Sequence, residues 1–286
     1  MSPDQYLPCP LCSSERFQLA TRRGSTVYGE CGQCGLGMVQ PPIEPDASRS
    51  GDSGVVRTST EYNRAMLEEI NGIEVAASRI APDKIKFWET TIGRPVGSVI
   101  DVGCGSGGYW KAMEKAGIQW RGVDVNEEMV SFAQTRGAPV ELGNFAEFGF
   151  VEEFDVVFFS QVLEHVLEPL PFMAAVATAL RPGGIVHLDV PNHSSLTSVI
   201  RKLNPGSPDY GFLQPPNHLV AYTRPSLEWL IAESGLEVVS VSAEPNDHRV
   251  FGQALPKIGA ASRFVYRMSG LMGRGSLLVG IAKKTE

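Results

Sequence analysis

The chain has 286 residues, of which 43% are hydrophobic and 20% are charged, and its formal net charge is −7. This composition predicts a soluble globular protein with one main domain and room for a smaller accessory domain. No apolar stretch reaches the length of roughly 18 residues that a membrane span requires, so we expect no membrane partner. Because binding to phosphates requires clustered Lys and Arg, the acidic balance also argues against a nucleic-acid partner.

Four cysteines near the start of the chain form two C-x₂-C pairs. Cys9 and Cys12 make the first pair, and Cys31 and Cys34 make the second. This spacing is typical of a zinc ribbon, since four thiolates complete the tetrahedral shell of a structural Zn²⁺. Disulfides or redox-active pairs are the weaker alternative, because polar residues rather than an apolar leader follow Met1, which predicts a reducing, cytoplasmic location. We therefore expect a zinc ribbon over residues 1–45.

The segment after the ribbon changes composition twice. It is first rich in Pro, Ser, Gly and Asp, which predicts a linker or mobile loop over residues 46–60. The main domain then occupies residues 61–286. Its first part, 61–92, has apolar residues at three- and four-residue intervals, so we expect a helical cap with a break near Pro82.

Strands and helices are predicted to alternate through the rest of the chain. Apolar runs indicate strands at 98–102, 120–125, 139–142, 154–160, 184–190, 236–243 and 276–284, and helices at 109–117, 127–136, 168–180 and 225–234. This order is typical of an α/β fold with βαβ units around a mainly parallel sheet. We expect the loop 193–217 to contribute to the substrate site.

A glycine-rich turn, DVGCGSGG at 101–108, joins the first of these strands to its helix. Glycine permits positive φ and close approach of a ligand to the backbone, and the helix N-terminus offers N–H groups to an anion. Asp124 ends the next strand, where a carboxylate suits a ribose diol. The spacing of Gly103, Gly105 and Gly108 also fits the dinucleotide fingerprint, so these residues leave NAD and another adenosine cofactor open.

Five motifs carry a resemblance to a known family: DVGCGSG (101–107), VDV (123–125), FDVVFFSQVLEHV (154–166), LRPGG (180–184) and VPN (190–192). Their order and spacing resemble class I S-adenosylmethionine (SAM)-dependent methyltransferases over residues 95–285. The segment 215–237 resembles the branch that acts on small molecules. The resemblance implies a Rossmann-like sheet of seven strands, mainly parallel with an antiparallel last strand, and SAM as the cofactor.

The resemblance also implies roles for individual residues. The methionine moiety would contact Asp101 and the backbone of Gly103, Cys104 and Gly105, with Cys104 itself a small residue lining the turn. The other cofactor-binding residues would be Asp124 at the ribose, Val125, Asn144 and Phe145 around the adenine, and Ser160 and Gln161 near the sulfonium.

Three histidines are candidate general bases for an acceptor that must lose a proton: His218, His165 and His193. For each of them a structural, hydrogen-bonded imidazole is the competing interpretation. Some O-methyltransferases bind a divalent cation through an ExxEH motif at the position of QVLEH. Gln161 replaces the first carboxylate here, which predicts a poor Mg²⁺ site.

We expect a SAM-dependent methyltransferase that acts on a small molecule, with a hydroxyl of a sugar or natural product as the acceptor. Sugar C-methyltransferases also have an N-terminal Cys₄ segment, but they carry a further large C-terminal domain. The other hypotheses are a zinc-ribbon rRNA methyltransferase, a non-catalytic SAM-binding protein and a NAD-dependent oxidoreductase. The ribbon is expected to cover the substrate side or to recruit a protein partner.

Overall fold

A computed structural model describes residues 6–40, 68, 70–204, 206, 209–245, 269 and 273–285. The linker predicted at 46–60 lies outside the described residues, as do 61–67 of the predicted cap. Among the described helices, none combines the length and apolar character needed to cross a lipid bilayer.

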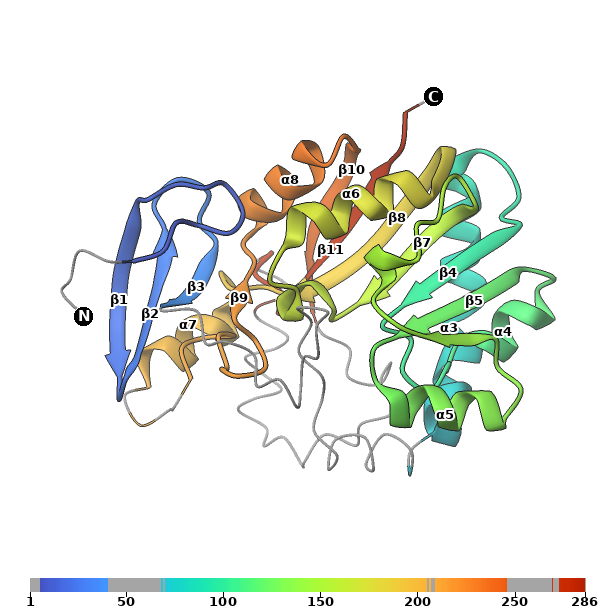
Figure 1. Cartoon of the computed structure of the whole chain (residues 1–286), viewed down its shortest axis with the longest axis horizontal. Coiled ribbons are helices and arrows are strands. Elements are labelled where there is room, and N and C mark those ends of the chain that lie inside the picture. Colours follow the sequence, from blue (N-terminus) through green and yellow to red (C-terminus); the bar gives the residue numbers. More distant parts are fainter. Residues whose placement is uncertain are drawn as a thin grey trace.

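A sheet of seven strands forms the centre of the protein, as predicted (Figure 1). Its spatial order is β10-β11-β8-β7-β4-β5-β6. The parallel part comprises β4 (Ser98–Val102), β5 (Gln119–Asp124), β6 (Val140–Leu142), β7 (Phe154–Ser160) and β8 (Leu180–Pro191). The last strand, β11 (Leu277–Lys283), is antiparallel to both β8 and β10 (Glu237–Glu244). The carboxyl ends of the parallel strands therefore meet at one edge of the sheet.

Helices cover both faces of this sheet. One face packs against α3 (Ile70–Ile92), α4 (Trp110–Lys115) and α5 (Glu127–Thr135), and the other against α6 (Pro169–Ala179) and α8 (Arg224–Glu233). Consecutive β7 residues Phe158 and Phe159 are both buried and belong to the two different cores. A strand buried on both faces reads as a continuous apolar run, which is why 154–160 was recognisable from sequence.

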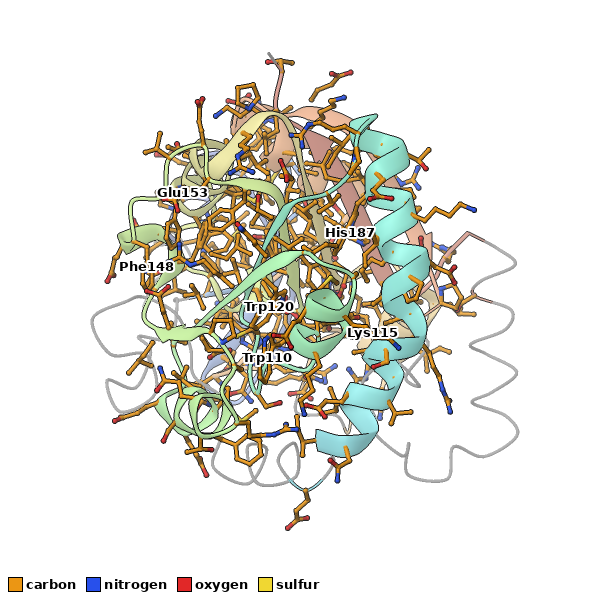
Figure 2. All side chains as sticks on the ribbon, turned by 90° about the vertical axis from the view of Figure 1, so that its right-hand side faces the viewer. Trp110, Lys115, Trp120, Phe148, Glu153 and His187 are labelled. Atoms are coloured by element: carbon orange, nitrogen blue, oxygen red, sulfur yellow. The ribbon has the colours of Figure 1, made fainter. Side chains whose placement is uncertain are left out.

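Helix α3 runs without interruption through Pro82, so the predicted break is wrong. Its buried residues Ile70, Ala77, Ala81 and Trp88 lie on one helical face, and Ala81 and Trp88 belong to the core on this side of the sheet. Figure 2 shows α3 running along the side of the sheet. Pro82 is exposed and removes only one backbone hydrogen bond on the solvent side, so packing of the opposite face keeps the helix continuous.

The cysteine-containing segment folds into strands β1 (Phe17–Arg23), β2 (Thr26–Cys31) and β3 (Gly37–Gln40), which pair antiparallel. A fourth strand, β9 (Val220–Ala221), comes from the main domain and pairs with β3 (Figure 1). Leu36 of the ribbon is fully buried in the same core cluster as Leu163 and Tyr222. The ribbon is thus joined to the main domain by both a sheet and a shared core.

The expected substrate loop 193–217 contains a helix, α7 (Leu196–Leu203), that the sequence analysis did not predict. The Ser195 hydroxyl accepts a hydrogen bond from the Ser198 N–H and caps this helix. Two short 3₁₀ turns, η2 (Phe145–Glu147) and η3 (Leu163–His165), follow the carboxyl ends of β6 and β7.

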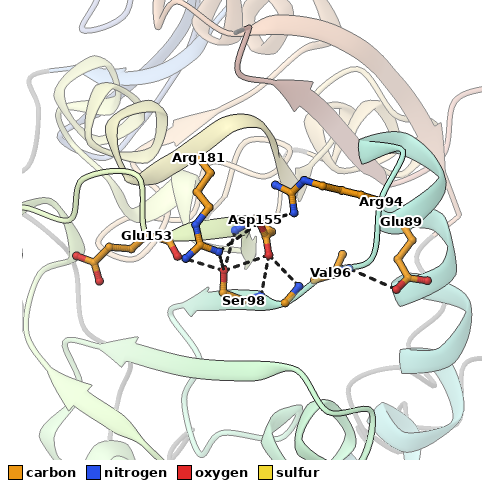
Figure 3. Close-up of polar contacts among 8 residues, drawn as sticks. Glu89, Arg94, Val96, Ser98, Glu153, Asp155 and Arg181 are labelled. Carbon is orange, nitrogen blue, oxygen red and sulfur yellow. Dashed lines mark hydrogen bonds and ion pairs between the residues drawn. The ribbon is translucent and has the colours of Figure 1, made fainter.

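At the amino-terminal edge of the parallel strands, Asp155 joins neighbouring segments through hydrogen bonds and ion pairs (Figure 3). Its Oδ2 accepts hydrogen bonds from the N–H groups of Gly97 and Ser98 at 2.8 and 2.9 Å. Its Oδ1 faces guanidinium groups of Arg94 at 2.7 Å and Arg181 at 3.3 Å. Each carboxylate oxygen of this buried group has partners, so the edge contributes to stability.

Candidate functional site

The glycine turn opens the site at the carboxyl end of β4. Gly103 and Gly105 have φ values of +70° and +55°, a region that L side chains rarely adopt. A Cβ at Gly103 would also lie 2.5 Å from Cγ2 of Val162, so any other residue there would displace the loop after β7. The turn therefore needs glycine for conformation and for space.

Asp124 ties this turn to the next strand. Its Oδ2 accepts a hydrogen bond from the Gly105 N–H at 2.7 Å, and its Oδ1 accepts one from the Asn126 N–H at 2.8 Å. Burial raises the pKa of Asp124, and these backbone hydrogen bonds partly oppose the shift. The carboxylate is thus held in a fixed orientation next to the glycine backbone.

Asp101 lies beside the turn, and the cation of Lys84 acts on it electrostatically. Burial, reinforced by the charge of Asp124, raises the pKa of Asp101 to about 8, while Lys84 acts in the opposite direction. Lys84 extends from α3, with its Nζ 4.5 Å from the ring centroid of Phe158. Burial lowers the pKa of Lys84, and Asp189 and Asp101 oppose that shift. Lys84 was not predicted as a site residue, although it is a cation on a predicted helix.

The ends of β7 and β8 are joined by a second carboxylate, Asp189. Its Oδ1 accepts hydrogen bonds from the Ser160 hydroxyl and from the Gln161 side-chain amide, both at 2.9 Å. Burial raises the pKa of Asp189, and those two hydrogen bonds oppose the shift. The sequence analysis also missed Asp189, whose signal was an acidic side chain in the apolar run 184–190.

His165, the last residue of η3, lies next to His218, with ring centroids 4.8 Å apart. Nδ1 of His165 donates to the carbonyl of Asn217 at 2.9 Å, and Nδ1 of His218 donates to the carbonyl of Phe212 at 3.2 Å. In the neutral ring, each Nε2 is then an acceptor. Burial lowers the pKa of His165 to about 3 and also lowers that of His218, so both imidazoles are neutral near pH 7.

Glu164 completes this group. It is 1% exposed, neither carboxylate oxygen has a partner among the described residues, and burial raises its pKa to about 8. One donor atom each from Glu164, His165 and His218 lies within 4.8 Å of the others, a set of oxygen and nitrogen atoms that could hold a divalent cation. Gln161 does not join them, since its amide binds Asp189.

His193 lies elsewhere, fully buried between the ribbon and α7. Its Nε2 is 3.3 Å from Oε1 of Glu30, which also pairs with Lys202 at 2.7 Å. A Cβ added to Gly37 of the ribbon would be 2.7 Å from the same ring atom. This complete burial leaves His193 no surface for a substrate, and the structural interpretation of this residue fits its position.

The residues expected around the adenine have mixed environments. Val125 is partly exposed next to Asp124, whereas Phe145 is 3% exposed and packs against Phe150 and Phe172. The Asn144 side chain caps η2 by accepting from the Ala146 N–H at 3.2 Å. Cys104 is partly buried, and burial raises the pKa of its thiol, as expected for a packing residue.

The four N-terminal cysteines converge. Sulfur atoms of Cys9 and Cys34 are 3.7 Å apart and those of Cys12 and Cys31 are 3.5 Å apart, with all four within 4.8 Å. These separations are too long for S–S bonds of about 2.05 Å. A tetrahedral Zn²⁺ with Zn–S bonds of about 2.3 Å requires sulfurs about 3.8 Å apart, so the cluster fits zinc.

Comparisons with known proteins agree with this arrangement. A family profile described as a methyltransferase domain matches residues 74–241. The ubiquinone biosynthesis O-methyltransferase of Leptothrix cholodnii is 28% identical over 165 residues, covering 51% of this chain and 70% of the relative. The protein of the same name from Burkholderia pseudomallei is 28% identical over 177 residues, covering 56% of this chain and 73% of the relative.

Solved structures share the fold. A SAM-dependent methyltransferase from Archaeoglobus fulgidus superposes with a TM-score of 0.52 at 20% identity, over 74% of this chain and 94% of that one. A plantazolicin methyltransferase, solved with a desmethyl analogue and S-adenosylhomocysteine, gives 0.53 at 15% identity, over 79% and 89%. At these identities the likeness concerns the fold.

Proposed function

Because the chain belongs to the methyltransferase-domain family and is a class I SAM-dependent methyltransferase, we propose that it methylates a hydroxyl group of a small molecule of the sugar or natural-product type. The contact between Asp124 and the glycine turn supports the cofactor site, because it holds a carboxylate next to the glycine backbone. The name O-methyltransferase in the relatives supports a hydroxyl acceptor.

We propose roles for the cofactor-binding residues on the same basis. Asp101 and the backbone of Gly103–Gly105 would hold the methionine moiety, with Asp101 facing its ammonium group. Asp124 would bind the ribose, and Val125 and Asn144 border the adenine position at the ends of β5 and β6. SAM supplies an electrophilic methyl group, so the main task of the protein is to align donor and acceptor.

His218 and His165 would contact the acceptor. Both rings are neutral, each offers Nε2 as a hydrogen-bond acceptor, and both lie beside the carboxyl edge of the sheet. We propose that they orient the acceptor molecule by accepting hydrogen bonds from polar groups other than the hydroxyl that is methylated. A His218→Ala variant should bind S-adenosylhomocysteine normally and methylate its acceptor at least tenfold more slowly, a loss of about 1.4 kcal/mol in transition-state stabilisation.

Calorimetry with S-adenosylhomocysteine and NADH tests the cofactor, and methyl-labelled SAM with an extract of low-mass metabolites from the source cells tests the acceptor. We expect binding of S-adenosylhomocysteine without NADH, and label in a small molecule as an ether. Label in RNA, or as an amine or C-methyl product, would contradict a hydroxyl acceptor. Binding without any transfer would favour a non-catalytic SAM-binding protein.

The ribbon would hold one structural zinc and fix the acceptor side of the site. The support is that β3 pairs with β9, which directly follows the segment carrying His218. Elemental analysis should find one zinc per chain, and Cys31→Ser should lose it and destabilise the ribbon while S-adenosylhomocysteine still binds. Cys104→Ser, outside the cluster, is the matched control and should keep its zinc. Loss of cofactor binding in Cys31→Ser would show that the ribbon belongs to the cofactor site.

A further inference from the structure

The carboxyl edge of the sheet contains four acidic side chains, and their contacts separate them into different roles. Both oxygens of Asp124 are occupied by backbone N–H groups. Both oxygens of Glu164 are enclosed by protein without a partner among the described residues. Asp101 lies on β4, opposite Phe158 in register, and is assigned above to the ammonium group of the cofactor. Asp189, which lies at the end of β8 next to the end of β7, is the one of these four without an assigned role.

One oxygen of Asp189 is fixed and the other is available. Oδ1 receives the two hydrogen bonds from Ser160 and Gln161. Oδ2 receives none from any residue that the structure describes, and the Asp189 residue keeps 9% of its surface exposed. A carboxylate held rigidly by one oxygen, with the second one accessible, has the geometry of a positioned proton acceptor.

The backbone at Gln161 supports a functional arrangement. Gln161 has a φ of +56°, in the left-handed region that a non-glycine residue rarely adopts. Its N–H also donates to the carbonyl of Asp189 at 3.0 Å, so both its backbone and its side chain bind the same residue. Such a backbone conformation persists only where neighbouring groups stabilise it. Here the two hydrogen bonds to Asp189, at the end of β8, stabilise it.

Asp189 lies at the edge of the sheet where the sulfonium of the proposed cofactor would bind. Ser160 pairs directly with Asp189 in the β7–β8 register, and both lie two residues beyond Phe158 and His187 on the α3 face. The Nζ of Lys84 lies 4.5 Å from the ring centroid of Phe158, and its charge acts on both Asp101 and Asp189. In open α/β sheets, ligands bind outside the carboxyl ends of neighbouring strands, which is where Ser160 and Asp189 end theirs.

We propose that Asp189 is the catalytic residue that takes the proton from the acceptor hydroxyl, with Ser160 and Gln161 as its positioning residues. This inference rests on the proposed function, since only a hydroxyl acceptor must lose a proton. The O–H proton passes to Oδ2 of Asp189, and the acceptor oxygen forms a bond to the methyl carbon. The carbon–sulfur bond breaks with its electron pair going to sulfur, which yields an ether and S-adenosylhomocysteine. Asp189 then releases the proton to solvent.

The test compares two cofactor analogues and needs no acceptor. Sinefungin replaces the methyl-bearing sulfonium with a carbon that carries an amine, so its ammonium group probes the place of the transferred methyl. Beside a carboxylate it should bind the wild type about tenfold or more tightly than S-adenosylhomocysteine, as expected for a charge-assisted hydrogen bond. Asp189→Asn should keep the affinity for S-adenosylhomocysteine within about twofold and lose this preference.

Glu244→Gln is the matched control, because Glu244 is an exposed carboxylate at the edge strand β10 whose charge also acts on Asp189. This variant should keep the preference for sinefungin. Should Asp189→Asn fail to fold, Asp189→Ser gives the same comparison, and binding of S-adenosylhomocysteine reports that the variant is folded.

Three results would overturn the proposal: no preference for sinefungin in the wild type, a preference that survives in Asp189→Asn, or equal weakening of both analogues in that variant. The last result would make Asp189 a residue for cofactor binding or folding. If the wild type binds neither analogue, the proposed function itself fails, which is a distinguishable outcome.

Discussion

The pKa values of buried carboxyl groups shift in opposite directions at the two edges of the parallel sheet. At the amino-terminal edge, burial acts to raise the pKa of Asp155, but hydrogen bonds from Arg94, Gly97 and Ser98 leave it lowered (Figure 3). At the carboxyl edge, burial prevails and raises the pKa of Asp101 and Glu164 to about 8. Pairing with guanidinium groups indicates a structural role for Asp155, whereas a buried carboxylate with a raised pKa and no such partner indicates a place for a ligand.

The largest expected effect is the pH dependence of stability at the carboxyl edge. The folded-state pKa of Asp101, about 8, lies above its ordinary value of 3.8. Between these values the folded protein binds one proton more than the unfolded chain, so Asp101 makes stability fall as pH rises. Relative to the wild type, the free energy of unfolding of Asp101→Asn should therefore increase by about 1.4 kcal/mol per pH unit between pH 4 and 8.

Urea unfolding at a series of pH values measures this difference. Taking the difference between variant and wild type removes the contributions of the buried histidines, whose lowered pKa values act in the opposite direction. A difference that does not change with pH would show that Asp101 is ionised in the folded protein.

The matched substitution at the other edge should act in the opposite sense. Asp155→Asn keeps the shape of the side chain but turns an amide donor toward N–H groups or guanidinium groups that need an acceptor. We expect a loss of about 3 kcal/mol in the free energy of unfolding, toward the lower end for a buried ion pair because Arg94 and Arg181 are partly exposed. Binding of S-adenosylhomocysteine by the folded variant should stay unchanged, and weaker binding would link the two edges.

Binding of the cofactor should stabilise the ionised form of Asp101 at the carboxyl edge and so release a proton. If the ammonium group of S-adenosylhomocysteine pairs with Asp101, binding favours the ionised form, so affinity should rise about tenfold from pH 6 to pH 7. Calorimetry in buffers with different ionisation enthalpies counts the released proton. The Asp101→Asn variant should bind more weakly and without this pH dependence, and an unchanged dependence would assign the proton to another group.

The smallest expected effect concerns the backbone of Gln161. Gln161→Gly relieves the left-handed conformation, worth about 1 kcal/mol, and removes one of the two hydrogen bonds to Oδ1 of Asp189. We expect stability to change by no more than about 1 kcal/mol while the preference for sinefungin decreases. Retention of the full preference would show that Ser160 alone positions Asp189.

Most of the sheet could be predicted because its strands are local patterns. The apolar runs at 98–102 and 154–160 match β4 and β7 to the residue, since burial on both faces requires consecutive apolar side chains. The glycine turn was recognisable for a similar reason, because the chain at Gly103 needs a conformation and a space that only glycine allows. The break at Pro82 was predicted wrongly because the local preference of proline was outweighed by packing of the opposite helical face.

Other parts depend on contacts between distant residues. The β3–β9 pairing joins residues 37–38 to residues 220–221, and neither segment has a pattern that names its partner. His193 follows a strand end where ligands bind, and only the position of the ribbon shows that it is covered. Lys84 and Asp189 come from a helix and a strand about 100 positions apart, and only the packing of α3 on the sheet brings their charges together.

The sequence by itself therefore determined the α/β order, the glycine turn with Asp124, and the convergence of Cys9, Cys12, Cys31 and Cys34. These features rest on residue types at short spacing, where backbone conformation and ligand geometry leave few alternatives. The tertiary structure decided which buried carboxylates have partners that offset the cost of burial and which do not. Burial and hydrogen-bond partners depend on strand register and helix packing, so Asp155 and Asp189, both acidic residues in apolar strands, acquire different roles only in the folded protein.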